Sequence, residues 1–228
     1  MEKLLQVYDR LVIFDTETTG LDFERDEIIE LAAAVIELRS GKPKVIEEYD
    51  NLIRLSPGVE LPKKIQELTH IEPWQLETQG INKGELCQDI TRIFGKPSTL
   101  LLAYNAHFDL SFLFHTLRKF GDFTILRGKD KIDLLTVYRD RRSYPHRLAS
   151  AIEAYGLGDQ VQNSHRAIDD VLATVAVMEK MIAERDDILN YVNLFGYNAR
   201  YGVGKHPISS VTYRPQGYEP GREPVYAR

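Results

Sequence analysis

Two carboxylates stand at the end of an apolar run near the N-terminus. Asp15 and Glu17 lie in the stretch FDTETTGLD, residues 14–22, and the apolar residues 11–14 lead directly into it. The apolar run predicts a buried strand, and alternation along a strand places both acids on the same face. Like charges side by side repel each other, and partial burial increases that repulsion. The pair therefore calls for a partner that relieves it.

A third acid, Asp109, lies in AYNAHFDLSFL, residues 103–113. It falls in the first turns of a predicted helix that follows a buried strand, and at helical spacing it shares the inward face with Phe112, Leu113 and Thr116. Taken alone, Asp109 is explained as an N-terminal acid that favours the helix dipole. An acid on an inward face near a strand end also needs a partner.

A fourth acid lies in SHRAIDDVLATVAVM, residues 164–178, where Asp169 and Asp170 open an apolar helix. Asp170 shares a face with Thr174 and Val177, one strip of that helix. His165 precedes Asp170 by five residues, which is about 140° around a helix axis. The two can serve one site only if His165 lies in the loop that enters the helix. Taken alone, this segment is an acidic helix N-terminus beside a solvated histidine.

Considered together, Asp15, Glu17, Asp109 and Asp170 form a set that could bind hard divalent cations, Mg²⁺ or Mn²⁺, through oxygen ligands. Two such ions about 3.5–4 Å apart stabilise the attacking and leaving oxygens in phosphodiester cleavage. A histidine side chain, with an ordinary pKa of about 6.5, can accept the proton of the attacking water, and His165 is the candidate.

Three motifs carry a family resemblance. FDTETTGLD, YNAHFDLSFL and HRAIDDVLAT resemble, in this order, the motifs of the DEDDh-type 3′→5′ exonucleases of the DnaQ-like family, whose patterns are D-x-E-T-T-G, N-A-x-F-D and H-x-x-x-x-D. That family includes the proofreading (epsilon) subunit of bacterial DNA polymerase III and the exonuclease domain of the Gram-positive replicative polymerase. The resemblance runs from about residue 11 to about residue 183.

The resemblance implies roles for the five candidate residues. Asp15 would contact both metal ions, Glu17 and Asp170 would complete the first, more tightly held metal site, and Asp109 would support the second metal site through water. His165 would be the general base. All five would be catalytic residues, with the four acids as metal ligands.

The resemblance also implies residues that bind substrate. Leu21 would pack against the terminal nucleotide, and the backbone of Thr18 would approach the 3′ end. Asn105 and Phe108 would shape the pocket. Tyr104 departs from the family pattern, in which many relatives have a histidine at this position, but that histidine is not a metal ligand.

The implied function is a 3′→5′ exonuclease that uses two divalent cations on single-stranded or mispaired 3′ ends of DNA. It would release nucleoside 5′-monophosphates in replication proofreading or repair, with a DNA polymerase subunit as a possible partner. An exonuclease that trims RNA ends or degrades oligoribonucleotides is the alternative, because that choice depends on contacts to the 2′-hydroxyl. A third hypothesis, an inactive polymerase accessory module that binds nucleic acid, predicts the loss of one or more acids, and all are present.

Composition limits the setting of this chemistry. A net charge of −5 disfavours a protein that coats nucleic acid through bulk electrostatics, although bound cations can supply local positive charge. The single Cys87 excludes an intrachain disulfide framework. We see neither a signal peptide at the N-terminus nor an apolar run long enough to span a membrane. We therefore expect a cytoplasmic protein.

The elements that must position these residues alternate between strands and helices. Strands are predicted over residues 11–16, 28–39, 45–55 and 100–104, and helices over 63–69, 83–94, 106–120, 132–139, 147–155 and 167–185. Asn105 is the predicted N-cap of the helix over 106–120, and Gly121 its end. The segment 28–39 is ambiguous by period and is assigned to a strand. This order predicts a mixed sheet covered by helices; the resemblance implies an α/β, ribonuclease H-like fold with helices on both faces.

The composition changes near the C-terminus. We predict an exonuclease domain over residues 1–185 and a basic extension rich in Gly, Pro and Tyr over residues 186–228. Residues 196–228 hold five basic and two acidic side chains, a net charge of +3, and show no helical or strand period. The extension is either an irregular arm or frayed tail, or an arm that contacts nucleic acid or a partner protein.

Overall fold

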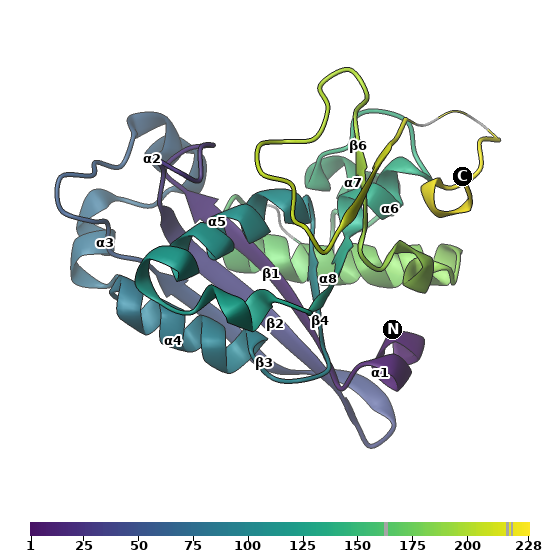
Figure 1. Ribbon diagram of the computed structural model, residues 1–228, viewed down its shortest axis with the longest axis horizontal. Coiled ribbons are helices and arrows are strands. Elements are labelled where there is room, and N and C mark those ends of the chain that lie inside the picture. The colour runs from purple at the N-terminus through teal and green to yellow at the C-terminus, as the bar shows by residue number, and fades with distance from the viewer. Residues whose placement is uncertain (162–163, 218, 220) are drawn as a thin grey trace.

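A twisted five-stranded mixed sheet forms the centre of the molecule (Figure 1). The computed structural model describes residues 1–161, 164–217, 219 and 221–228. The strand order is β3-β2-β1-β4-β5, in which β1 pairs antiparallel with β2 and parallel with β4. β2 and β3 are antiparallel, and β4 and β5 are parallel. The strands are β1 (Arg10–Thr18), β2 (Ile28–Arg39), β3 (Lys42–Leu52), β4 (Thr99–Ala103) and β5 (Asp130–Asp133).

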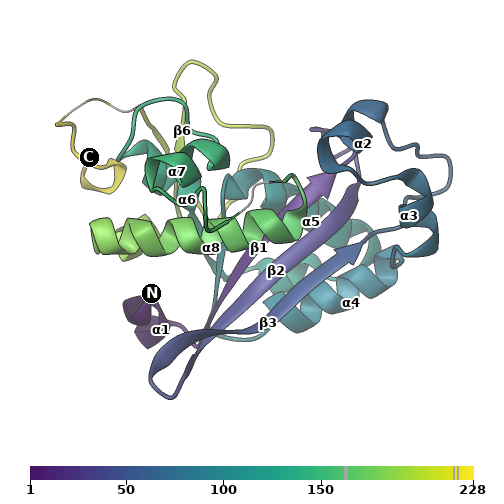
Figure 2. The same cartoon turned by 180° about the vertical axis from the view of Figure 1, so that it is seen from behind.

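Helices cover both faces of this sheet, as the two opposite views show (Figures 1 and 2). α4 (Lys83–Phe94) and α5 (Ala106–Phe120) lie on one face, and α8 (Ala167–Glu184) crosses the other. α6 (Leu134–Arg139) and α7 (Leu148–Ala154) extend the layer of α8. The described residues also form three short α-helices, α1 (Glu2–Val7), α2 (Lys63–Thr69) and α3 (Pro73–Thr78). The α/β, ribonuclease H-like fold is confirmed.

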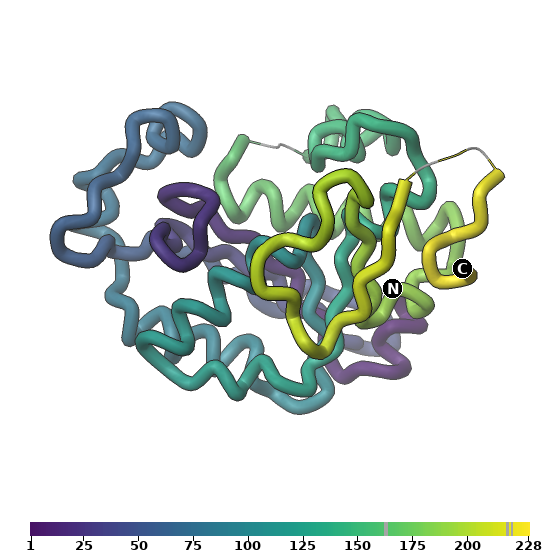
Figure 3. Tube along the Cα trace, turned by 45° about the horizontal axis from the view of Figure 1, so that its top comes forward, coloured from purple at the N-terminus to yellow at the C-terminus, as the bar shows by residue number. Residues whose placement is uncertain are grey.

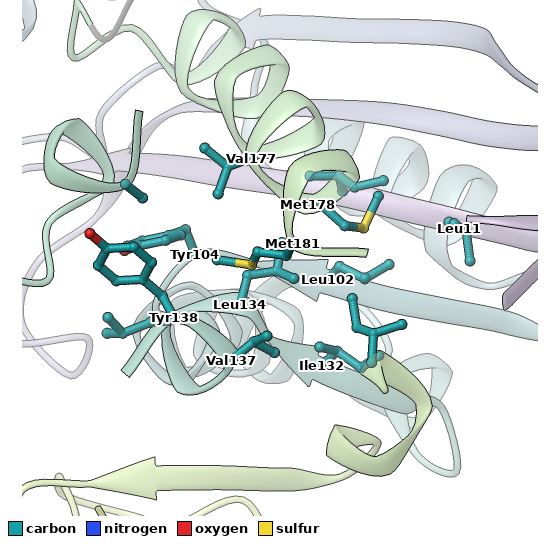
Figure 4. Packing of buried hydrophobic residues seen from close by; sticks show 14 of the residues in the cluster. Leu11, Leu102, Tyr104, Ile132, Leu134, Val137, Tyr138, Val177, Met178 and Met181 are labelled. Carbon is teal, nitrogen blue, oxygen red and sulfur yellow. The ribbon is translucent and has the colours of Figure 1, made fainter. Parts of the chain in front are cut away.

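Alternation along β1 builds two cores. Leu11 and Ile13 pack with α8, whereas Val12 and Phe14 pack with α4 and α5. Figure 4 shows how apolar side chains of α8 meet those of β4 and α6 in the first core. β2 is buried on both faces through residues 28–36, and this two-sided burial explains why its sequence has no clear strand period.

The helix predicted over residues 132–139 is present but begins two residues later, because the end of a strand occupies the first two positions. β5 ends at Asp133, and α6 begins at Leu134. The Asp133 carboxylate caps α6 by accepting hydrogen bonds from the backbone N–H groups of Leu135 and Thr136, each at 3.2 Å. A strand of only four residues, DKID, is too short and too charged to show an apolar alternation ahead of the helix.

The start of α5 also differs from the prediction. Asn105 occupies the N-cap position, but it has a left-handed φ of 73° and its side chain makes no capping hydrogen bond. The Asp133 carboxylate instead accepts from the backbone N–H groups of Asn105 (2.9 Å) and Ala106 (3.1 Å). Gly121 ends α5 as predicted.

The C-terminal extension lies on the domain and contains regular structure that the sequence did not reveal (Figure 3). β6 (Leu194–Tyr197) and β7 (Thr212–Pro215) form a parallel two-stranded sheet. Backbone hydrogen bonding joins it to β5, since the Asn193 N–H donates to the Lys131 carbonyl at 2.8 Å. Phe195 and Val225 are each 1 % exposed and belong to the two cores. Strands of four residues are too short to show alternation.

Phe195→Ala should lower the free energy of unfolding by about 3–5 kcal/mol, because the substitution leaves a cavity in the core. The matched control is Tyr201→Ala, at a side chain 75 % exposed in the same extension, which should change stability by less than about 0.5 kcal/mol. Chemical denaturation of the two variants measures the difference. Equal stability of both variants would contradict an extension that is integral to the folded unit.

Candidate active site

The C-terminal end of β1 presents the first two candidate acids on one face, as alternation requires. The strand register places Glu17 opposite Glu30 of β2 and Asp15 opposite Ala32. Thr16, between the two acids, points to the other face and is buried. The predicted juxtaposition of Asp15 and Glu17 is therefore present.

Asp109 reaches the same end of β1 from α5, on the opposite face of the sheet. Its side chain lies inward, at 2 % exposure. One carboxylate oxygen, Oδ1, accepts hydrogen bonds from the backbone N–H of Thr16 at 2.9 Å and from its hydroxyl at 2.7 Å. These bonds attach the first turn of α5 to the strand that carries Asp15 and Glu17.

His165 lies in the loop that enters α8, as the helical spacing required. α8 begins at Ala167, and His165 has a left-handed φ of 57° and an exposed side chain. Ligand atoms of Glu17, His165 and Asp170 all lie within 4.8 Å of one another. Asp15 and Asp109 are not members of this three-residue group.

The two adjacent acids of α8 have different surroundings. Asp170 is 8 % exposed and faces Glu17. Asp169 is half-buried, and its carboxylate accepts a hydrogen bond from the Ser164 hydroxyl in the entering loop. Asp170 therefore belongs to the cluster, whereas Asp169 bonds to the loop that enters α8.

Burial and mutual repulsion raise the carboxyl pKa values of this cluster. Burial, followed by the charge of Asp170, raises the pKa of Glu17 to about 8. Burial raises the pKa of Asp109 to about 7 even though the hydrogen bonds from Thr16 lower it. The pKa of Asp15 lies well above its ordinary value through burial and then the charges of Asp109 and Glu17. Clustered carboxylates that resist ionisation together are a donor set that suits hard divalent cations.

The start of α8 is held by a buried ion pair that could not be recognised in the sequence. Glu30 is fully buried, and its carboxylate accepts from Nε of Arg166 at 2.8 Å and from the backbone N–H of Ala167 at 2.9 Å. Arg166 lies next to His165 in the chain, so the pair fixes both the loop and the first turn of the helix. An acid within the otherwise apolar run 28–36 was the available signal, because a buried carboxylate requires a partner.

A pocket of about 520 Å³ has a lining that includes Leu21, Asn105 and Phe108, and Phe108 adjoins Asp109 in α5. Leu21 is 85 % exposed, which is unusual for a large apolar side chain. Thr18, the fourth residue predicted to bind substrate, is not among those that line the pocket; its hydroxyl donates to the Gly20 carbonyl at 2.6 Å. The structure thus brings three of the four predicted substrate residues to one pocket.

Among the residues that the structure describes, no helix has the length and apolar character needed to cross a membrane.

Known proteins share this sequence and fold. Residues 12–178 match the sequence model of a family described as "Exonuclease". The chain is similar to the PolC-type DNA polymerase III of Clostridium perfringens, with 31% identity over 213 residues that cover 89% of this chain and 14% of that protein. The PolC-type enzyme of Thermotoga maritima is 33% identical over 173 residues, which cover 75% of this chain and 12% of that protein. The chain therefore spans about one seventh of these curated relatives.

The fold also matches a solved structure. E. coli Exonuclease I in complex with a dT13 oligonucleotide aligns with a TM-score of 0.68 and 22% identity, covering 79% of this chain and 42% of that chain.

Removal of divalent cations should make stability depend on pH in a defined direction. Glu17, with a pKa raised from 4.5 to about 8, binds more protons in the folded than in the unfolded state between these values. The free energy of unfolding in chelator should therefore fall as pH rises through this window. Because cations favour the ionised carboxylates, stabilisation by Mg²⁺ or Mn²⁺ should be larger at about pH 8 than at about pH 6.

Thermal unfolding with chelator and with each cation, at both pH values, measures this effect. Glu17→Gln should flatten the pH dependence in chelator and reduce the stabilisation by cations. Stability in chelator that rises with pH over the same window would show that the cluster ionises freely.

Arg166→Gln should lower the free energy of unfolding by about 1.5–3 kcal/mol, since it leaves the buried Glu30 carboxylate without its charged partner. The double variant with Glu30→Gln should lose less than the sum of the two single losses, because both charges are then absent. Arg39→Gln, at a side chain 58% exposed in an ion pair with Glu37, is the control and should change stability by less than about 1 kcal/mol. Strictly additive losses in denaturant titrations would show that the pair does not hold α8.

Proposed function

Because the chain belongs to the exonuclease family, as a DnaQ-like 3′→5′ exonuclease, we propose that it hydrolyses phosphodiester bonds at the 3′ ends of DNA with two divalent cations. The family resemblance carried by the three motifs is confirmed. The observation that carries the proposal is the convergence of Glu17, His165 and Asp170 within 4.8 Å. These residues come from two of the three motifs, and Asp109 of the remaining motif is bonded to Thr16 between the two acids of β1.

The four acids would hold the cations. The charges of Asp109, Glu17 and Asp170 each raise the pKa of Asp15, and an acid that interacts with all three others would suit a ligand shared by two ions. When bound, the cations would stabilise the negative charge that develops on the attacking and leaving oxygens. The assignment of Glu17 and Asp170 to one ion and of Asp109 to the other is part of the proposal.

His165 is the proposed general base. Its side chain is exposed beside two of the acids, so that a ring nitrogen can accept the proton of an attacking water. The water oxygen attacks the last phosphodiester, the bond from phosphorus to the 3′ oxygen breaks, and a nucleoside 5′-monophosphate leaves. Leu21, Asn105 and Phe108 would hold the terminal nucleotide in the adjacent pocket, with the backbone of Thr18 near the 3′ end.

DNA is the favoured substrate, and the named relatives support this choice. Two are DNA polymerases of the PolC type, and the solved neighbour holds a dT13 oligonucleotide. A role in replication proofreading or repair, with a polymerase subunit as partner, rests on the same names. RNA trimming is the alternative substrate class. An inactive accessory module is disfavoured because all five catalytic-type residues are present and grouped at the end of β1.

Asp170→Asn should abolish release of nucleotides, because one ligand charge is lost at nearly constant shape. Asp169→Asn is the matched control, one residue away on the same helix, and should leave the rate within a few fold of the wild type. The assay follows product ladders from 5′-labelled single-stranded DNA, mismatched duplex DNA and RNA, side by side with Mg²⁺, Mn²⁺ or chelator.

Shortening from the 3′ end that requires a cation and is faster on DNA is the expected wild-type result. Digestion of a closed circular single strand, or full activity in excess chelator, would contradict the proposal. Equal losses from the two asparagine variants would show that Asp170 is not the specific ligand, and a faster RNA ladder would favour RNA trimming.

A further inference from the structure

The pocket lined by Leu21, Asn105 and Phe108 has a wall that comes from the C-terminal extension. Two sides come from the loop after β1, with Leu21 and Phe23, and from the start of α5, with Asn105 and Phe108. A third side comes from the loop between β6 and β7, with Gly204 and Lys205. This loop lies beyond residue 178, where the family match ends, so the exonuclease motifs do not account for it.

Close contacts attach the loop to α5. Nδ1 of His107 and the hydroxyl of Tyr213 in β7 form a hydrogen bond at 2.7 Å. The same hydroxyl accepts from the backbone N–H of Ile208 at 3.1 Å. A Cβ atom at Gly204 would lie only 2.9 Å from Nε2 of His107. Glycine therefore lets the loop backbone approach the first turn of α5 (Figure 3).

Further contacts attach the loop to the segment that carries Leu21. Nζ of Lys205 lies 3.3 Å from Oδ2 of Asp22, and Nε2 of His206 lies 3.1 Å from Oε1 of Glu24. The rings of His206 and Phe23 meet edge to face, with their centroids 5.6 Å apart. The loop thus bridges the two elements that form the rest of the pocket.

The lining offers a single strand apolar surface and one cationic side chain, beside the carboxylates of Asp22 and Asp26. Leu21, Phe23 and Phe108 offer apolar surface to a base. Lys205 is the one lysine or arginine among the described residues that line the pocket. Its side chain is 68% exposed in its ion pair with Asp22, and an exposed pair of this kind contributes at most about 1 kcal/mol. Lys205 can therefore exchange the Asp22 carboxylate for a phosphate.

We infer that the β6–β7 loop is a substrate-binding wall, in which Lys205 contacts an internucleotide phosphate of the strand being digested. This inference rests on the proposed function and extends it to a segment outside the family match. A phosphate contact of this kind strengthens binding of an oligonucleotide and adds to its salt dependence, but it takes no part in bond cleavage.

Lys205→Glu should raise KM for a single-stranded oligodeoxynucleotide by roughly fivefold or more with kcat unchanged, because a phosphate contact becomes a repulsion. The slope of log(kcat/KM) against log salt should fall by about 0.7, the share of one phosphate on a single strand. Lys42→Glu is the control with the same change of charge. Lys42 is exposed at the start of β3, at the opposite end of the sheet, and this variant should behave as the wild type.

Gly204→Ala tests the placement of the loop without a change of charge. The added Cβ must displace either the loop or the His107 ring that bonds to Tyr213, so KM should rise while the salt slope stays nearly unchanged. A wild type that does not digest the oligonucleotide would contradict the proposed function itself. An active wild type with unchanged KM in both Lys205→Glu and Gly204→Ala would overturn only the inference, as would equal effects of Lys205→Glu and Lys42→Glu.

Discussion

Repulsion among buried and half-buried carboxylates is the constraint on which this structure depends. Asp15, Glu17, Asp109 and Asp170 meet at the end of β1, where burial and neighbouring charge raise the pKa of the first three well above their ordinary values. A flexible chain would separate such groups. The protein holds them on elements that the two cores fix in place, so that the negative field remains available to cations.

Each acid is fixed by a different device. β1 is buried between helices on both faces, so that Asp15 and Glu17 cannot turn away from each other. Two hydrogen bonds to Thr16 attach Asp109 to the same strand. On the opposite face, the pair between Glu30 and Arg166 holds the start of α8 and with it Asp170. Glu30 also adds to the repulsion on Glu17, while Arg166 reduces it, so the pair both positions and balances the cluster.

The C-terminal extension, which lies beyond the residues matched by the family model, packs against this arrangement. Its apolar residues, among them Phe195 and Val225, are part of the cores, and its β6–β7 loop lies against α5 and the segment after β1. Stability and the shape of the pocket are therefore linked through one segment. The separation of residues 186–228 from the domain is a prediction that rests on composition alone. In the structure, the described residues of this segment pack against the domain that precedes them.

The arrangement of the candidate acids could be predicted from the amino-acid sequence, because motif spacing and local periodicity encode which residues share a face. Asp15 and Glu17 on one face, Asp109 turned inward and His165 outside α8 all followed from periods of two and 3.6 residues. Tertiary structure alone decided what depends on distant partners. The division of residues 132–139 at Asp133, the strands β6 and β7 and the partnership of Glu30 with Arg166 arise from contacts between remote segments. Such contacts leave no local period in the chain.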